Sequence, residues 1–238
     1  MKTYFLHPDS IRDLFNTIAP RYDFLNHLLS LRRDIYWRKR AVRALHGIEG
    51  RILDIATGTG DVAIEIVRQG TGRRSVWGLD FSEPMLRKAH EKLLRNRLLS
   101  VISLAQGDAV TLPFRDNTFA ASIMAFGLRN IPEKQRALSE MIRVTQEGGR
   151  VVILEFTLPQ HGLVRTLYPT YFMRVLPWIG GIFSGNEGAY RYLPQSVFHF
   201  QSARKYLELM RDVGLTELHS YRLTFGIANI MVGAKKDQ

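Results

Sequence analysis

The stretch that decides the fold is Leu53-Asp-Ile-Ala-Thr-Gly-Thr-Gly-Asp61. It continues a short apolar run with the length of a buried strand, and the residues after it, 61–69, have helical spacing. Gly58 and Gly60 let the backbone turn sharply from strand to helix and pass close to a ligand. A strand, a glycine-rich turn and a helix in this order predict a loop that binds a nucleoside-containing ligand.

Outward from this loop, strand-like and helical segments alternate. Strands are predicted over 51–56, 75–80, 101–105, 119–126 and 150–156, and helices over 61–69, 82–94 and 132–145, the last one stopping at Gly148-Gly149. This alternation predicts a doubly wound α/β fold, with a mostly parallel sheet and helices on both faces. A last helix over 202–213 and strand-like runs over 216–223 and 226–233 predict an antiparallel C-terminal hairpin at one edge.

The composition is that of an ordinary globular protein. Of 238 residues, 45% are hydrophobic and 23% are charged, which excludes a disordered chain. The chain has no cysteine, which excludes disulfides and thiolate chemistry and is compatible with a reducing cytoplasm. No uninterrupted apolar segment reaches the roughly 18 residues of a transmembrane helix. The net charge of +11 is typical of a protein with anionic partners, nucleic acid or acidic lipid headgroups, or of one with a solvated basic surface, and composition does not choose among these.

The loop leaves two ligand classes open, dinucleotides and S-adenosyl-L-methionine. Ala63 holds the third position of the dinucleotide Gly-x-Gly-x-x-Gly pattern, where some dinucleotide folds accept alanine. An acid inside the strand, Asp54, suits the ammonium group of adenosylmethionine. The loop resembles the first motif of adenosylmethionine-dependent enzymes, in which the methionine part of the ligand lies against the loop. The residues that this resemblance assigns to the ligand are Asp54, Thr57, Gly58, Thr59 and Gly60.

Two further strand ends carry acids. Asp80 ends the second predicted strand, where a carboxylate can accept hydrogen bonds from both ribose hydroxyls of an adenosine. Phe81 and Met85 follow and are expected to pack on the adenine, although the spacing of Met85 also fits a core residue. Asp108 and Ala109 follow the third strand, where adenosylmethionine enzymes bind the adenine. Ligands in open α/β sheets lie at the carboxyl ends of strands, so we expect one shared site.

Four segments carry a more specific resemblance. They are Phe15-Asn-Thr-Ile-Ala-Pro-Arg-Tyr-Asp-Phe-Leu-Asn-His-Leu-Leu-Ser30, Phe126-Gly-Leu-Arg-Asn130, Leu154-Glu-Phe156 and Tyr190-Arg-Tyr-Leu-Pro-Gln-Ser196. They look like the C-methyltransferases that finish menaquinone and ubiquinone biosynthesis, which have a seven-stranded sheet. The resemblance covers nearly the whole chain. Residues that depart from the usual pattern are Arg32, Asp34, Ala120, Ala125 and Gln201.

The resemblance implies methyl transfer from adenosylmethionine to a ring carbon of demethylmenaquinol. A ubiquinone-precursor polyprenyl benzoquinol, or another small molecule, is the alternative acceptor. Such a reaction needs in-line approach, stabilisation of a phenolate-like ring and a proton acceptor, and it requires neither a metal nor a covalent enzyme intermediate.

Three residues are candidates for the chemistry on the acceptor. Arg129 is expected to stabilise the phenolate and Asn130 to orient a water or hydroxyl, with deprotonation left to water because arginine is a poor base. Tyr22 lies four residues before Asn26 on a helical lid. Two structural alternatives stay open: Arg129 pairs with a carboxylate such as Asp23, and Tyr22 packs on the core.

The same resemblance implies the organisation of a single domain. We expect a helical lid over 1–48, a donor-binding core over 49–156, an aromatic insert for substrate or membrane contact over 157–200, and a C-terminal helix and hairpin over 201–238. A basic cluster surrounds Tyr36 and Trp37 and is either a solvated helix face or a contact for anionic headgroups. Its members are Arg32, Arg33, Arg38, Lys39, Arg40 and Arg43.

These features predict a cytoplasmic protein that binds the inner face of the membrane peripherally, with an isoprenoid quinol as substrate and a homodimer as a possible assembly. The charge also motivates a nucleic-acid methyltransferase. The Asn/Asp-Pro-Pro-Tyr/Phe motif of amino-group methylation is missing after the fourth strand, however, so we expect no nucleic-acid partner. A non-catalytic nucleoside-binding protein is the second alternative.

Overall fold

A computed structural model describes residues 13, 15–70, 74–157 and 202–237 of the chain. The predicted aromatic insert lies outside these residues except for Thr157, as do the Tyr190–Ser196 segment and Gln201. In the described ranges no helix has the length and apolarity that crossing a membrane requires.

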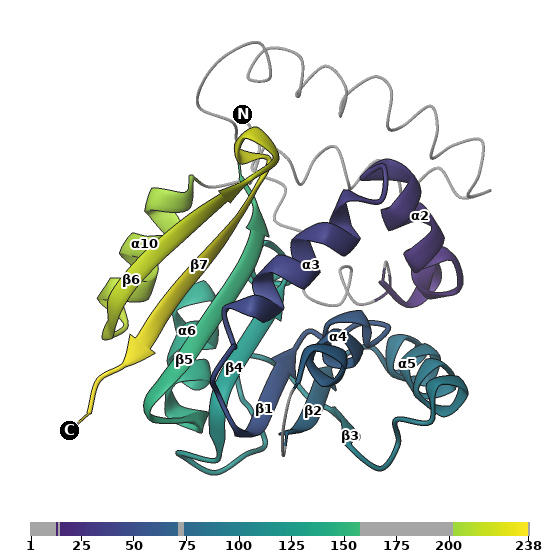
Figure 1. The fold of residues 1–238 in the computed structure, drawn as a ribbon, viewed down its shortest axis with the longest axis horizontal. Helices are drawn as coiled ribbons and strands as arrows, with labels where there is room; N and C mark the ends of the chain where they lie inside the picture. Colours follow the sequence, from purple (N-terminus) through teal and green to yellow (C-terminus); the bar gives the residue numbers. More distant parts are fainter. Residues whose placement is uncertain (1–12, 14, 71–73, 158–201, 238) are drawn as a thin grey trace.

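Seven strands form one sheet, in the order β3-β2-β1-β4-β5-β7-β6 (Figure 1). The first five strands pair in parallel, and β7 pairs antiparallel with both β5 and β6. The predicted doubly wound fold with its C-terminal antiparallel hairpin is therefore confirmed. The strands are β1 (Gly50–Ile55), β2 (Arg74–Asp80), β3 (Ile102–Gln106), β4 (Phe119–Ala125), β5 (Thr145–Phe156), β6 (Leu215–Leu223) and β7 (Ala228–Lys235).

Helices cover both faces of the sheet. Successive residues of a strand point to opposite faces, and because the central strands are apolar at successive positions, both faces must be buried. Ile52 and Val152 pack in the core on the side of α3 and α4, whereas Leu53 and Ile153 pack in the core on the side of α6 and α10. The helices are α2 (Tyr22–Leu29), α3 (Arg33–Arg43), α4 (Asp61–Gln69), α5 (Glu83–Asn96), α6 (Lys134–Val144) and α10 (Ala203–Asp212); short 3-10 turns are η1 (Ala19–Arg21), η2 (Leu128–Asn130) and η4 (Thr224–Gly226).

One boundary differs clearly from the prediction. The helix predicted to end at residue 145 ends at Val144, but β5 begins at once with Thr145 and not, as predicted, at residue 150 after Gly148-Gly149. Thr145 pairs with Phe119, and the register then shifts before regular pairing resumes. Gly148, with φ of +67°, lies within this irregularity. The glycines therefore shape a bulge at the start of the strand, a use that the sequence pattern does not distinguish from a helix stop.

The strand order reverses between β1 and β4, which are neighbours in the sheet. The chain runs from β1 outward to β2 and β3 on one side, and from β4 outward to β5 on the other. A crevice forms outside the carboxyl ends of the strands at such a point. The loops after β1, β2, β3 and β4 meet there, and the N-terminal helices α2 and α3 lie over the same half of the molecule (Figure 1). This placement decides where a ligand can bind.

Candidate active site

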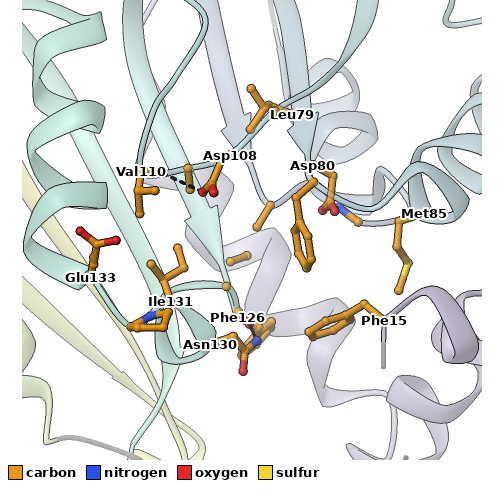
Figure 2. Close-up of a pocket in the computed structure, with 18 of the residues that line it drawn as sticks. Phe15, Leu79, Asp80, Met85, Asp108, Val110, Phe126, Asn130, Ile131 and Glu133 are labelled. Carbon is orange, nitrogen blue, oxygen red and sulfur yellow. Dashed lines mark hydrogen bonds between the residues drawn. The ribbon is translucent and has the colours of Figure 1, made fainter. Parts of the chain in front are cut away.

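A pocket of about 400 Å³ opens at the carboxyl ends of the first four strands (Figure 2). Its walls include Gly58 after β1, Asp80 at the end of β2, Asp108 after β3 and Phe126 after β4. Residues from three separate predicted motifs therefore line one cavity, as expected for residues at the carboxyl ends of neighbouring parallel strands. Phe15, from the N-terminal segment, completes the wall on the opposite side.

The carboxylate of Asp80 is built into the wall of the pocket. Its Oδ2 accepts a hydrogen bond from the N–H of Gly58 at 2.8 Å, and its Oδ1 accepts one from the N–H of Ser82 at 2.9 Å. Burial raises the pKa of Asp80 to about 6, and the backbone donors oppose that rise. Each carboxylate oxygen can accept more than one hydrogen bond, so this group can bind the glycine loop and a hydroxyl-bearing ligand together.

Asp54 lies behind the loop and is buried. The hydroxyl of Thr57 donates a hydrogen bond to Asp54 Oδ2 at 2.5 Å, and the backbone N–H of Thr57 donates to the carbonyl of Leu79. Among the described residues, Asp54 Oδ1 has no hydrogen-bond partner. Burial raises the pKa of Asp54 to about 7, although Thr57 and the nearby N–H of Ala63 lower it. Behind the loop, this arrangement leaves a carboxyl group with one oxygen, Oδ1, that no described residue bonds.

The loop itself has the backbone that its glycines predicted. Gly58 and Gly60 have φ of +56° and +84°, and a Cβ placed on Gly60 would lie 3.3 Å from the Cβ of Ala89. Thr59, which the sequence assigned to the ligand, instead donates its hydroxyl to Asp23 Oδ1 at 2.5 Å. Asp54, Thr57, Thr59 and Gly60 are absent from the pocket wall, whereas Gly58 lines it, and the ligand contacts assigned to all five stay predictions.

Aromatic side chains line the side of the pocket that follows β2. The Phe81 ring meets Phe15 edge to face, with 6.2 Å between ring centroids. Met85 is 2% exposed, as a core residue is, and it also lines the cavity, whereas its contact with the adenine stays a prediction. Phe15 could not be assigned to the site from the sequence, because an isolated aromatic residue gives no local signal for a binding site.

Asp108 and Ala109 both lie in the pocket wall. Asp108 Oδ1 accepts from the N–H of Val110 at 3.0 Å, which fixes the carboxylate at the start of a tight turn (Figure 2). The turn is closed by a bridge between Asp108 and Thr111. The adenine contact assigned to this segment stays a prediction.

The three candidates for acceptor chemistry are placed differently. Tyr22 and Asn130 line the pocket, whereas Arg129 does not. Arg129 Nη1 donates to Glu155 Oε1 at 2.8 Å and to the carbonyl of Phe126 at 2.6 Å. The structural alternative of a carboxylate partner is thus realised with Glu155 and not with Asp23, which is held elsewhere. A direct contact between Arg129 and a ring remains a prediction.

Glu155, which the sequence reasoning missed, is completely buried. It accepts the N–H of Arg129 at 3.0 Å and the N–H of Phe156 at 2.9 Å, besides the guanidinium. The sequence gives no sign that Glu155 is a buried ion-pair partner, because its partner, Arg129, follows a different strand.

Tyr22, the candidate lid residue, is also affected by its surroundings. Burial raises the pKa of its hydroxyl, and the nearby Asn26 side chain and two arginines oppose that rise.

The basic cluster is partly internal, which corrects the prediction that the whole cluster faces a membrane. Trp37 is 2% exposed and donates its Nε1–H to Thr224 Oγ1 at 2.8 Å. Arg38 is buried against Asp34, with Nη1 2.5 Å from Oδ2. Helical spacing turns these two residues toward the sheet. The cations that stay exposed are Arg32, Arg33, Lys39, Arg40 and Arg43.

Within the part of the chain that the structure describes, no three histidine or acidic side chains gather into a metal-binding group. The acids of the site are instead used as hydrogen-bond acceptors for backbone N–H groups and hydroxyls, as at Asp80 and Asp54.

The sequence and the structure were compared with known proteins. The profile of the ubiE/COQ5 methyltransferase family matches residues 4–235. The ubiquinone/menaquinone biosynthesis C-methyltransferase UbiE of Geobacter sulfurreducens is 46% identical over 228 residues, covering 95% of this chain and 89% of that protein. The demethylmenaquinone methyltransferase of Thermus thermophilus is 46% identical over 225 residues, covering 92% and 99%.

A more distant relative, the demethylmenaquinone methyltransferase of Lactiplantibacillus plantarum, is 36% identical and covers 99% of both chains. Among solved structures, a methyltransferase from Thermotoga maritima, described as a possible histamine N-methyltransferase, superposes with a TM-score of 0.68 at 20% identity, covering 94% of this chain and 99% of that one. That likeness shows the fold alone. The match over almost the whole sequence shows more: this chain belongs to the ubiE/COQ5 methyltransferase family.

Proposed function

We propose that the chain transfers a methyl group from S-adenosyl-L-methionine to a ring carbon of demethylmenaquinol, giving menaquinol. The observation that carries the proposal is the convergence of Gly58, Asp80 and Asp108 on one pocket in a chain of this family. The relatives from Thermus thermophilus and Lactiplantibacillus plantarum are named for demethylmenaquinone.

The residues of the pocket fit the methyl donor. Asp54 is buried behind the loop and does not line the pocket, and we assign its Oδ1, which no described residue bonds, to the donor's ammonium group. Asp80 offers lone pairs to ribose hydroxyls, and Phe81 and Met85 offer apolar surface to the adenine. When bound, the donor supplies an electrophilic methyl group on a sulfonium.

The part of the pocket that follows β4, which we assign to the methyl acceptor, is mostly apolar with a few polar side chains. The polar side chains of the wall after β4 include Asn130 and Glu133, and Phe126 and Ile131 lie near Asn130 (Figure 2). The side chain of Tyr22, from α2, also lines the pocket. An apolar wall suits a flat quinol ring, and one or two polar groups fix its orientation. We assign Asn130 and Tyr22 to orient a ring hydroxyl or a water that takes its proton.

Arg129 acts from behind this wall. Its guanidinium holds the carbonyl of Phe126 and lies 5.2 Å from the ring centre of Phe156. Its positive charge favours a phenolate in the pocket over the neutral quinol, and Glu155 fixes its position. In this arrangement Arg129 stabilises charge without touching the ring.

A ubiquinone-precursor benzoquinol is the second candidate acceptor, because the Geobacter sulfurreducens relative is named for both quinones. We further propose that the protein is cytoplasmic and meets the membrane inner face peripherally, through the exposed cations of α3 and the insert over 157–200. The homodimer and the division into lid, core, insert and hairpin belong to the same proposal.

The test is a reaction of the purified protein with adenosylmethionine and each of the two quinols, analysed by mass spectrometry. We expect demethylmenaquinol to gain one methyl group on carbon. Turnover of the benzoquinol alone would transfer the assignment to the second candidate. Methylation of neither quinol by a protein that binds the donor would contradict the quinol assignment.

A further inference from the structure

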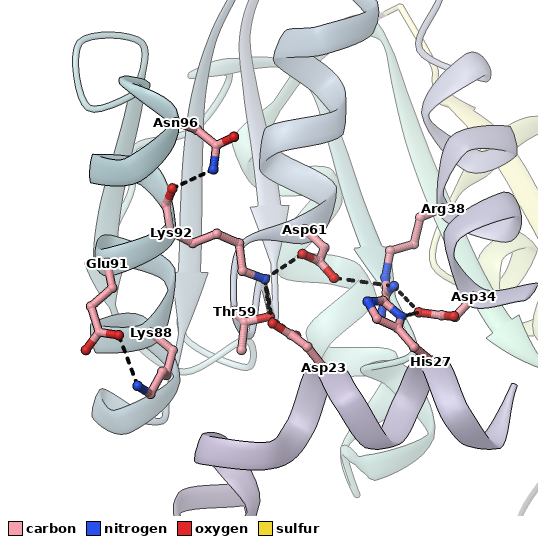
Figure 3. A network of polar contacts seen from close by, with 10 residues as sticks. All are labelled: Asp23, His27, Asp34, Arg38, Thr59, Asp61, Lys88, Glu91, Lys92 and Asn96. Carbon is pink, nitrogen blue, oxygen red and sulfur yellow. Dashed lines mark hydrogen bonds and ion pairs between the residues drawn. The ribbon is translucent and has the colours of Figure 1, made fainter. Parts of the chain in front are cut away.

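Lys92, on α5, joins three separate parts of the molecule through one ammonium group (Figure 3). Its Nζ lies 2.7 Å from Asp23 Oδ2 on α2, 2.6 Å from Asp61 Oδ1 at the start of α4, and 3.1 Å from Thr59 Oγ1 in the glycine loop. An ammonium has three hydrogens to donate, so all three are used. Asp23, Thr59, Asp61 and Lys92 are called the Lys92 cluster below.

The Lys92 cluster holds α2 beside the pocket through the contacts of Asp23 with Lys92 and Thr59. Tyr22, the neighbour of Asp23, lines the cavity, and a Cβ placed on Gly58 would lie 3.9 Å from its Cε1. Phe15, from the same N-terminal segment, packs against Phe81 on the other side of the opening. The position of α2 relative to the loop therefore sets the width of the cavity between Gly58 and these rings.

The charges of the cluster explain why Lys92 in particular holds α2. Asp23 and Asp61 both point at the same ammonium, so without it the acid on α2 faces an acid on α4. Asp61 would still lie 3.5 Å from Arg38 Nη1, whereas Asp23 would keep only the hydroxyl of Thr59 among the described residues. Loss of Lys92 thus removes an attraction and leaves a like-charge repulsion between α2 and the loop region.

The cluster is also placed where it can open. The side chains of Lys92, Asp23 and Asp61 are 24%, 34% and 26% exposed, so water reaches all three. Hydrated ion pairs are individually weak, and they break without the loss of core packing that a buried pair would cause. The fastening of α2 is therefore reversible.

We propose that Lys92 is a positioning residue that holds α2 closed over the donor pocket, and that its contact with Asp23 limits the rate at which the donor and its demethylated product exchange. The proposal rests on the proposed function, in that the pocket takes adenosylmethionine. Lys92 touches neither ligand in this account and acts through α2 and the loop.

The test compares Lys92→Met with Lys88→Met. Lys88 lies one turn earlier on α5 and, among the residues that the structure describes, forms an ion pair only with Glu91, at 3.0 Å, where both side chains are more than 40% exposed. We expect Lys92→Met to release S-adenosylhomocysteine about tenfold faster in stopped-flow measurements and to bind adenosylmethionine correspondingly more weakly. Lys88→Met should match the wild type, and Lys92→Arg should recover much of the affinity.

A double-mutant cycle ties the effect to α2. If Lys92 acts through Asp23, then Asp23→Asn combined with Lys92→Met should release the product little faster than the faster single variant. Melting curves of each variant accompany the rates, because a merely structural role would lower the melting temperature without this coupling.

Three results would overturn the proposal: product release from Lys92→Met at the wild-type rate, equal effects of Lys92→Met and Lys88→Met, or additive effects in the cycle. Wild-type protein that binds no adenosylmethionine would instead contradict the proposed function. The two failures are therefore distinguishable.

Discussion

The guanidinium of Arg129 donates to Glu155 Oε1 at 2.8 Å, and Glu155 has no exposed surface. This pair joins the end of β4 to the end of β5 beneath the acceptor side of the pocket. Because both charges are buried, each depends on the other far more than a surface pair would. The relationship changes what a substitution at Arg129 is expected to do.

Arg129→Ala should lower both stability and activity. It leaves the Glu155 carboxylate buried without its cation, which costs about 3–5 kcal/mol of unfolding free energy. Adding Glu155→Gln removes that uncompensated charge and should restore most of the stability. The rate should stay low in the double variant, because the positive charge near the phenolate is still missing. Urea unfolding and single-turnover rates test this, and recovery of the rate together with the stability would contradict a role for Arg129 in the reaction.

The glycine loop offers a matched pair of substitutions. Gly60 and Gly214 both have positive φ, +84° and +97°, but only Gly60 belongs to the donor loop. Alanine at either position should cost about 1–2 kcal/mol of stability from backbone strain. Only Gly60→Ala should also weaken donor binding, because it presses on Ala89 and shifts the loop. If calorimetric titration gives both variants the same affinity for adenosylmethionine, the assignment of the glycine loop to donor binding is contradicted.

The buried acid Asp54 predicts a pH dependence of stability. Its pKa is raised from 3.8 to about 7 by burial, so the folded chain holds a proton that the unfolded chain releases. Between about pH 4 and 7 the folded state binds more protons, and this group's contribution to stability therefore falls as pH rises. In unfolding experiments without donor, wild type should lose more stability than Asp54→Asn between pH 5 and 7.5. Parallel curves for the two proteins would contradict the ionisation assigned to Asp54.

The exposed cations of α3 predict binding to anionic membranes. Arg40 and Arg43 lie on its solvent face, and each basic residue near an anionic surface contributes about 1 kcal/mol. Vesicles with anionic lipid should sediment the protein at low salt, and binding should weaken as salt rises. Arg40→Glu with Arg43→Glu should bind less, whereas Arg87→Glu with Arg95→Glu on α5 changes the net charge equally and should bind as the wild type does, apart from the effect of net charge. Equal sedimentation with neutral and anionic vesicles would remove the electrostatic part of this proposal.

Much of the fold was predictable because it depends on local patterns. Alternating strands and helices fix a parallel sheet, and strand ends fix where Asp80 and Asp108 meet, whatever the details of packing. The start of β5 was not predictable, since Gly148-Gly149 serves a bulge as readily as a helix end.

The interactions between distant charges were also beyond the sequence. Arg38 and Lys92 occupy polar helix positions that resemble any solvated face, yet both pair with Asp61 from a different element. Glu155 occupies a strand position whose only distinction is its partner, Arg129, 26 residues away. Such pairs become visible only when the fold has brought the elements together.

The most direct test of the account is the dependence of single-turnover methylation of demethylmenaquinol on donor concentration, with a labelled methyl group, in wild type and Asp80→Ala. Asp80→Ala loses a charge-assisted acceptor worth about 1.5–3 kcal/mol, so it should need about 10- to 100-fold more donor to reach the half-maximal rate. The label should appear in menaquinol in both proteins. Identical donor curves for the two proteins, or no labelled menaquinol from the wild type, would contradict the assignment of this pocket to methyl transfer.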